Sequence, residues 1–170
     1  MSEPAEILFE KRGAIGLITL NRPKALNALT HAMCVSMKAQ LAAWAEDAAV
    51  KCIVIQGEGE RAFCAGGDIR TLYDSGKAGT PYALAFYRDE YLLNAAIKHY
   101  PKPYIALLRG FVMGGGVGVS VHGTIALPTR PCCSPCRKPA SDSSPMSVAV
   151  SSCRVFRAKS ACISALPARG

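Results

Sequence analysis

The sequence predicts an α/β fold in which helices cross over between the strands of a mostly parallel sheet. Three short aliphatic runs have the length and composition of buried strands, at residues 16–20, 52–55 and 104–108. Segments with helical spacing of apolar residues lie between these runs. A strand, a helix and a further strand in that order imply βαβ crossovers. The 170 residues are enough for one domain with a hydrophobic core.

The first half of this pattern contains one strand and one helix. The strand at residues 16–20 ends at the turn-forming sequence Asn21-Arg22-Pro23. Thr30 is a candidate N-cap for the helix that follows. Apolar side chains recur along that helix at helical spacing and predict one buried stripe: Met33, Met37, Leu41 and Trp44.

The second half repeats the alternation of strands, loops and helices. The strand at residues 52–55 leads into a Gly-rich loop from Gly57 to Asp68. A second helix is predicted from Pro81 to about His99, with Thr80 as its N-cap and proline at its first position. A third strand at residues 104–108 then leads into a run of three glycines.

The net charge of +8 and the eight cysteines are distributed unevenly along the chain. Residues 1–122 hold 13 basic and 11 acidic side chains, a net charge of +2. Residues 123–170 hold seven basic side chains, one acidic side chain and five of the cysteines. We therefore predict a domain boundary near residue 123, with a partial domain in 1–123 and a disordered tail in 124–170.

Charge and cysteine content alone would suggest a nucleic-acid partner, a zinc site or disulfides, but the positions of the residues favour none of them. Cys133 and Cys136 have the spacing of half a zinc site, whereas Cys153 and Cys162 are too far apart for the other half. The basic tail lacks the interleaved aromatic residues of a nucleic-acid site. No apolar run approaches the roughly 20 residues of a membrane span. The start of the chain has no apolar stretch typical of a signal peptide, which predicts a cytoplasmic protein without disulfides, metal or membrane partner.

Two glycine-rich loops, at residues 63–69 and 112–118, follow buried strands. Ligands of parallel sheets bind at the carboxyl ends of the strands. Glycine lets a backbone N–H approach a ligand closely, and two N–H groups that converge on one oxygen would form an oxyanion hole. The same glycines also suit tight turns and close packing, and the pattern alone leaves both interpretations open.

Three motifs resemble the crotonase (enoyl-CoA hydratase/isomerase) superfamily. They are LNRPKALNAL at 20–29, AFCAGGDIR at 62–70 and KPYIALLRGFVMGGGVGVSVHG at 102–123. They occur in the order typical of the superfamily and cover most of residues 6–123. The resemblance implies the amino-terminal part of a crotonase-like spiral of β–β–α units, truncated after these motifs.

Within the superfamily, the motifs resemble the 3-hydroxyisobutyryl-CoA hydrolases more than the hydratases, as does FYRDEYLLN at 86–94. Hydratases carry a catalytic Glu at the position of Gly118, which makes hydration of a double bond the less expected chemistry. The resemblance implies hydrolysis of 3-hydroxyisobutyryl-CoA in valine breakdown, with an acyl-CoA as partner and no cofactor besides the CoA of the substrate. Two alternatives stay open: an enoyl-CoA hydratase/isomerase, and a non-catalytic acyl-CoA-binding or interaction protein. No feature of the sequence indicates an oligomeric state.

The resemblance also implies roles for individual residues. Gly67 and Gly115 match the positions whose N–H groups bind the thioester oxygen. Glu90 matches an acidic residue that lines the acyl pocket and meets the substrate hydroxyl; without the resemblance it would be interpreted as a solvated carboxylate on a helix. The positions that surround the CoA moiety are Lys24, Ala25, Ala65, Asp68 and Ile69.

Residues 124–170 do not resemble the superfamily. In the hydrolases the chain continues with a segment that carries two catalytic carboxylates, P-E-T-G-I-G-L-F-P-D-V-G-G, whereas here Asp142 is the one acidic residue. We therefore predict that this chain does not turn over acyl-CoA. Residues 124–170 can be back-translated with permitted codons so that a shifted reading frame encodes the missing segment. Most bases in this back-translation are free, but methionine has one codon, and the last base of the Met146 codon is the first base of the valine codon that the hydrolase segment requires in the shifted frame. We hypothesise a frameshift close to Gly123, in the gene or in its sequencing.

Overall fold

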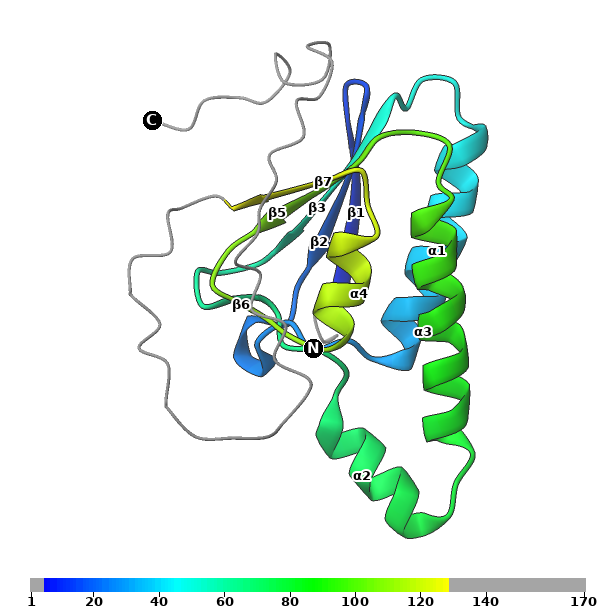
Figure 1. Cartoon of the computed structure of the whole chain (residues 1–170), viewed down its shortest axis with the longest axis vertical. Coiled ribbons are helices and arrows are strands. Elements are labelled where there is room, and N and C mark those ends of the chain that lie inside the picture. Colours follow the sequence, from blue (N-terminus) through cyan, green and yellow to red (C-terminus); the bar gives the residue numbers. More distant parts are fainter. Residues whose placement is uncertain (1–4, 129–170) are drawn as a thin grey trace, which may run out of the picture.

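The computed structural model describes residues 5–128, which form one five-stranded sheet covered by helices (Figure 1). The sheet has the strand order β1-β2-β3-β5-β7, and a second sheet pairs β4 with β6. β1 is antiparallel to β2, whereas every other pair is parallel. The elements in chain order are β1 (Ile7–Arg12), β2 (Ile15–Leu20), a 3₁₀ turn (Pro23–Ala25), α1 (His31–Glu46), β3 (Cys52–Gly57), β4 (Ala62–Cys64), α2 (Ile69–Ala78), α3 (Tyr82–Lys98), β5 (Tyr104–Leu108), β6 (Phe111–Val112), α4 (Gly115–Val121) and β7 (Ile125–Pro128). The predicted α/β class and the mostly parallel sheet are confirmed.

The main core lies between the sheet and the helices α1, α3 and α4. Side chains on alternate positions of the strands enter it, including Ile18 and Leu20 of β2 and Ile53 and Ile55 of β3. The intervening positions form a second apolar cluster on the other face of the sheet: Ile15, Leu17, Cys52, Val54 and Ile105. Both faces of the central strands are therefore apolar, as expected for parallel strands.

Helix α1 begins as the sequence predicts. The Thr30 side chain accepts a hydrogen bond from the Met33 N–H at 3.3 Å, which satisfies one of the donors at the start of the helix. The predicted stripe is buried along the face of α1 that packs on the sheet: Met33, Met37, Leu41 and Trp44. The positions of apolar residues along the strands and along α1 reflect which side chains are buried, and for this reason the sequence could predict these strands and this helix.

Several local predictions are wrong. Pro81, not Thr80, is the N-cap of α3, and the Thr80 hydroxyl pairs instead with Ser75 Oγ at 2.7 Å. The loop predicted at residues 57–68 contains β4, because Ala62–Cys64 pairs with β6. The second glycine loop includes the first turn of α4, which starts at Gly115.

The first residues of the predicted tail form a strand. Ile125–Pro128 forms β7, which pairs in parallel with β5, and the Thr124 hydroxyl accepts a hydrogen bond from Tyr104 N at 3.2 Å. An aliphatic run after the turn at Gly123 can pair with the open edge of β5 whatever its origin, so residues 125–128 are not part of a disordered tail. The rest of that predicted tail, 129–170, lies outside the described residues.

Candidate functional site

The two glycine loops meet at one end of the molecule. Pairing of β4 with β6 brings them together, and Met113 N donates to Cys64 O at 3.0 Å. A methyl group built on Gly66 would lie only 3.5 Å from the Gly115 nitrogen. Gly66 has a φ of +103° and Gly114 a φ of +50°, so both turns need the conformational freedom of glycine. We call residues 65–68 the Gly67 loop and residues 113–116 the Gly115 loop.

The Gly67 N–H points away from the strand-like segment beside it. Gly67 forms an isolated parallel bridge with Leu29: Leu29 N donates to Gly66 O at 2.8 Å, and Asp68 N donates to Leu29 O at 2.9 Å. Backbone groups alternate in direction along an extended chain. Because Gly66 O and Asp68 N face Leu29, the Gly67 N–H faces the opposite side.

The Gly115 N–H also has no acceptor among the described residues, for a different reason. Gly115 is the first residue of α4, and the first N–H groups of a helix have no partner within the helix. Within residues 5–128, neither this N–H nor that of Gly67 has a backbone acceptor. Two unpaired donors therefore lie on loops that touch.

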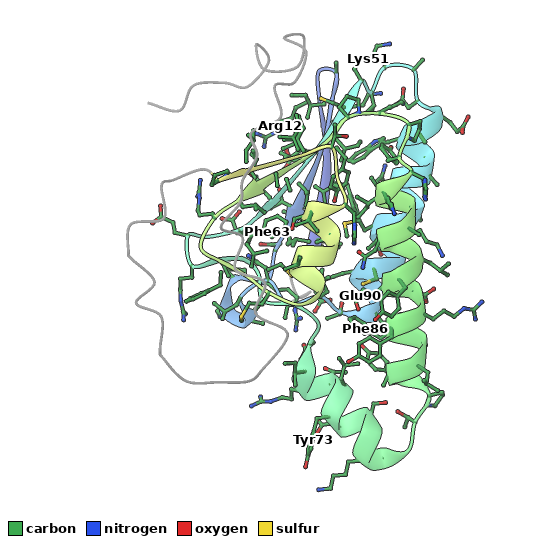
Figure 2. The ribbon with its side chains drawn as sticks, viewed as in Figure 1. Arg12, Lys51, Phe63, Tyr73, Phe86 and Glu90 are labelled. Atoms are coloured by element: carbon green, nitrogen blue, oxygen red, sulfur yellow. The ribbon has the colours of Figure 1, made fainter. Side chains whose placement is uncertain are left out.

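One face of α3 packs against both loops. Phe86, Glu90 and Asn94 follow one another at intervals of four residues, and Figure 2 shows Phe86 and Glu90 on the same side of the helix. A methyl group on Gly67 would lie 2.9 Å from the Phe86 ring, and one on Gly115 would collide with Glu90 Oε1. The helix thus places a ring under one loop and a carboxylate under the other.

Glu90 is a buried carboxyl on α3. Its residue exposure is 8% and, within the described residues, no ion pair or hydrogen bond offsets its burial, which raises the pKa of Glu90 above its ordinary value. Burial, followed by the charge of Glu90, raises the pKa of the neighbouring Cys34 thiol to about 12. A carboxyl with a raised pKa beside unpaired N–H groups is typical of a functional site.

The positions expected around CoA are arranged along the neighbouring turn and loop. Lys24 and Ala25 are exposed on the 3₁₀ turn, and Ala65 N donates to Leu26 O at 3.0 Å, which ties that turn to the Gly67 loop. Ile69 is 76% exposed at the start of α2. The 3₁₀ turn and the Gly67 loop are thus joined by a backbone hydrogen bond, and Ile69 follows that loop directly.

Asp68 differs from the other expected CoA positions because its carboxylate is already paired. It accepts a hydrogen bond from Thr71 N at 3.4 Å as the N-cap of α2, and it forms an ion pair of 2.9 Å with Arg22. Burial is the largest single influence and opposes ionisation, but the hydrogen bonds from Arg22 and Thr71 and the charge of Arg22 together outweigh it, so the pKa of Asp68 is lowered. The carboxylate is therefore part of the internal framework of the loop.

Sequence reasoning missed two residues that hold this region together. Arg22 contacts Asp68, the Ala28 carbonyl and Glu6. Asn27 is 1% exposed with a φ of +56°; its side chain accepts from Arg22 N and donates to two carbonyls, those of Glu58 and Ala62. The one available signal was an Asn in a turn, since Asn tolerates positive φ.

The position of the hydratase carboxylate is closed by a neighbouring side chain. A methyl group on Gly118 would lie 2.5 Å from Asn94 Nδ2. The Asn94 Oδ1 atom is buried and has no hydrogen-bond partner within the described residues. A carboxylate at position 118 would therefore require Asn94 to move.

Other kinds of site were searched for in the same residues. In the described part of the chain, no cluster of three or more His, Cys, Asp or Glu side chains could hold a metal ion. Among the helices there, none combines the length and apolar character that a membrane crossing requires. The cysteine pair at 133 and 136 lies outside the described residues.

Comparison with known proteins identifies the family. The enoyl-CoA hydratase/isomerase family model matches residues 15–133. The mitochondrial 3-hydroxyisobutyryl-CoA hydrolase of Danio rerio is 54% identical over 126 residues, which are 74% of this chain and 33% of that protein. The Homo sapiens protein of the same name is 50% identical over 127 residues, again 33% of its length. The chain thus spans about a third of the length of these curated relatives.

Solved structures give the same result. A carnitinyl-CoA dehydratase from Mycobacterium thermoresistibile has a TM-score of 0.71 and 50% identity, over 72% of this chain and 36% of that one. An enoyl-CoA hydratase from Rhodobacter sphaeroides 2.4.1 has a TM-score of 0.68 and 47% identity, over 71% and 36% of the two chains. Family match, curated relatives and fold agree, and the chain belongs to the enoyl-CoA hydratase/isomerase family of the crotonase superfamily.

Proposed function

We propose that residues 5–128 form the acyl-CoA-binding part of a thioester hydrolase that acts on 3-hydroxyisobutyryl-CoA in valine breakdown. One observation supports this most strongly: the N–H groups of Gly67 and Gly115, which have no acceptor among residues 5–128, lie on touching loops, with the Glu90 carboxyl against Gly115. The names of the curated relatives point to the same substrate.

The chemistry of a thioester fits these groups. Attack on the thioester carbon converts the carbonyl oxygen into an oxyanion, and two N–H groups directed at that oxygen stabilise the charge as it develops. Glu90, in turn, would accept a hydrogen bond from the 3-hydroxyl group of the acyl chain. Bound substrate would thus give the buried carboxyl the partner that it lacks within the described residues.

The CoA moiety would lie along the Lys24 turn and the outer side of the Gly67 loop. The Lys24 ammonium is exposed and can reach a phosphate, while Ala25, Ala65 and Ile69 offer small or apolar surface. The proposal needs no cofactor other than the CoA of the substrate.

The chain itself would bind without turnover, because the segment with the two catalytic carboxylates is not in its sequence. We attribute this to the frameshift near Gly123. Resequencing the gene across that codon tests the attribution: an unambiguous read in the present frame, with no hydrolase segment in the alternative frame, would contradict it.

A hydratase is the weaker enzymatic candidate because of Gly118 and the Asn94 side chain packed on it. A non-catalytic acyl-CoA-binding protein is the candidate from another class. Purified 1–170, incubated in turn with 3-hydroxyisobutyryl-CoA and crotonyl-CoA, separates them. We expect binding of the first ligand without release of free CoA, no hydration of the second, and CoA release once the shifted frame is restored. CoA release by 1–170, or crotonyl-CoA hydration by the restored chain, would contradict the proposal.

The location in the cell is a separate question. The sequence predicts a cytoplasmic protein, whereas the curated relatives carry mitochondrial names. The cytoplasmic location stays a prediction, and fractionation of cells that express the tagged chain would test it.

A further inference from the structure

Arg22 makes contacts on both sides of the Leu29–Gly67 bridge. Its Nη1 donates to the Ala28 carbonyl at 2.7 Å, and its Nη2 contacts Asp68 Oδ2 at 2.9 Å. Ala28 precedes Leu29 and Asp68 follows Gly67, so the two arms of one guanidinium hold the neighbours of both bridge residues. A planar group with a fixed fork of donors sets the separation of the two segments.

The surroundings of Arg22 make these contacts stronger than an ordinary surface ion pair. The side chains of Arg22 and Asp68 are 19% and 18% exposed. Arg22 Nε also contacts Glu6 Oε1 at 3.0 Å, and the other oxygen of Glu6 accepts from the Thr30 hydroxyl at 2.7 Å. The network therefore extends from the Gly67 loop to the cap of α1, and each charged group in it has a partner.

The bridge that Arg22 braces decides where the Gly67 N–H points. That N–H faces away from Leu29 only because Gly66 O and Asp68 N both bond to Leu29. If the two segments separate, these two bonds are lost and Gly67, which has no side chain, can turn freely. We propose that Arg22 is a positioning residue that fixes the direction of the Gly67 N–H by bracing both segments of the bridge. The importance of this direction for ligand binding rests on the function proposed above for Gly67.

The variant Arg22→Gln tests, without any ligand, whether Arg22 braces the Leu29–Gly67 bridge. We expect the amide hydrogens of Leu29 and Asp68 to exchange about tenfold faster, because their opening free energy falls by about one hydrogen bond. Amides of the β1–β2 pair should keep their rates, which shows that the fold persists. Unchanged exchange at Leu29 and Asp68 would overturn the proposal.

Two ligands that differ in one group test whether the direction of the Gly67 N–H, held by Arg22, matters for binding a thioester carbonyl. Isobutyryl-CoA has the thioester carbonyl, whereas S-isobutyl-CoA has a methylene there and the same CoA moiety. We expect the 1–170 chain to bind the thioester about tenfold more tightly, as two modest hydrogen bonds allow, and Arg22→Gln to abolish that preference while binding S-isobutyl-CoA normally. Equal weakening for both ligands would mean that Arg22 contacts CoA itself, or that the loop has collapsed, and would overturn the proposal.

Two further variants serve as controls. Asp68→Asn keeps an acceptor for the cap of α2 but removes the charge, so it should reduce the thioester preference less than Arg22→Gln does. Arg12→Gln removes an exposed pair, 2.7 Å from Glu10, near the β1–β2 turn and away from Glu90 (Figure 2), and should leave the preference intact. If the unaltered chain shows no thioester preference, the proposed role of Gly67 fails; the exchange rates still decide whether Arg22 holds the bridge.

Discussion

The Gly67 loop and the Gly115 loop lie side by side but are held in place by different forces. Polar contacts hold the first: the ion pair of Arg22 with Asp68, the backbone bridge to Leu29 and the bond from Ala65 N to Leu26 O, while the Asn27 amide fixes the start of the adjoining β4. Close packing holds the second, where glycines leave no room between the backbone, Cys64 and α3. The difference predicts that changes in hydrogen bonding disturb the first loop, and changes in volume the second.

The largest expected effect is on the Gly115 loop. In Gly116→Ala the new methyl group would collide with the Cys64 carbonyl and lie 2.8 Å from Cys64 Cβ. Because backbone must shift to relieve this, we expect the free energy of unfolding to fall by about 3 kcal/mol. Urea denaturation measures it.

Gly76→Ala is the matched control for that variant. Gly76 lies within α2, and a methyl group there would meet nothing within 4 Å. Alanine favours a helix over glycine, so this variant should gain up to about 1 kcal/mol. Equal losses in both variants would contradict close packing as the force that holds the Gly115 loop.

The next effect is on the polar side. Asn27→Asp keeps the shape of the side chain but removes the two N–H donors now bonded to Glu58 O and Ala62 O, at 3.0 and 2.9 Å. Two carbonyls would then face a buried carboxylate. We expect a loss of about 2 kcal/mol at neutral pH, measured by urea denaturation and smaller in acid, where the new carboxyl is protonated and can donate. A loss under about 0.5 kcal/mol, the size of an ordinary surface change, would contradict the role of Asn27.

The smallest effect concerns Glu90, whose side chain extends from α3 toward the Gly115 loop. Because burial raises the pKa of Glu90 above the ordinary 4.5, the folded state holds this proton more tightly than the unfolded state. The resulting stability is fully present below the ordinary pKa and is lost as the pH rises through the raised one. Glu90→Gln removes this loss, so its melting temperature should exceed the parent's by a few degrees at pH 8 and converge with it near pH 4.

Thermal unfolding from pH 4 to pH 8 measures the difference. The exposed Glu60→Gln is the control, and its curve should follow that of the parent chain. A Glu90→Gln variant that melts below the parent at pH 8 would show that the carboxylate stabilises the fold, contrary to a carboxyl whose burial no partner among residues 5–128 offsets.

The sheet and α1 could be predicted because their apolar spacing directly reflects burial. β1 escaped prediction because none of its six residues is fully buried and Glu10, Lys11 and Arg12 stand at its end, which hides the alternation. The α4 helix escaped because six of its seven residues and its N-cap are glycine or valine, which are poor helix formers. Local pattern thus identifies elements that face a core and misses those fixed by their neighbours.

Only part of the site could be predicted, because contacts between residues far apart in the sequence leave no local pattern. Its glycines and Glu90 came from motif resemblance, whereas the partners of those residues are distant in sequence. Arg22 and Asp68 are 46 positions apart, and nothing local to either residue indicates their ion pair. The contact of Glu90 with Gly115 likewise depends on how α3 packs on α4, which the sequence of α3 alone does not specify.

The most direct test of the central claim observes the two N–H groups themselves. Amide NMR spectra of the 1–170 chain would be recorded with isobutyryl-CoA and with S-isobutyl-CoA. We expect the amide protons of Gly67 and Gly115 to move downfield with the thioester and to stay in place with the thioether, because only the thioester offers a carbonyl oxygen to both donors. Equal shifts with both ligands, or no shift at either glycine with bound thioester, would contradict the claim that these loops hold the thioester oxygen.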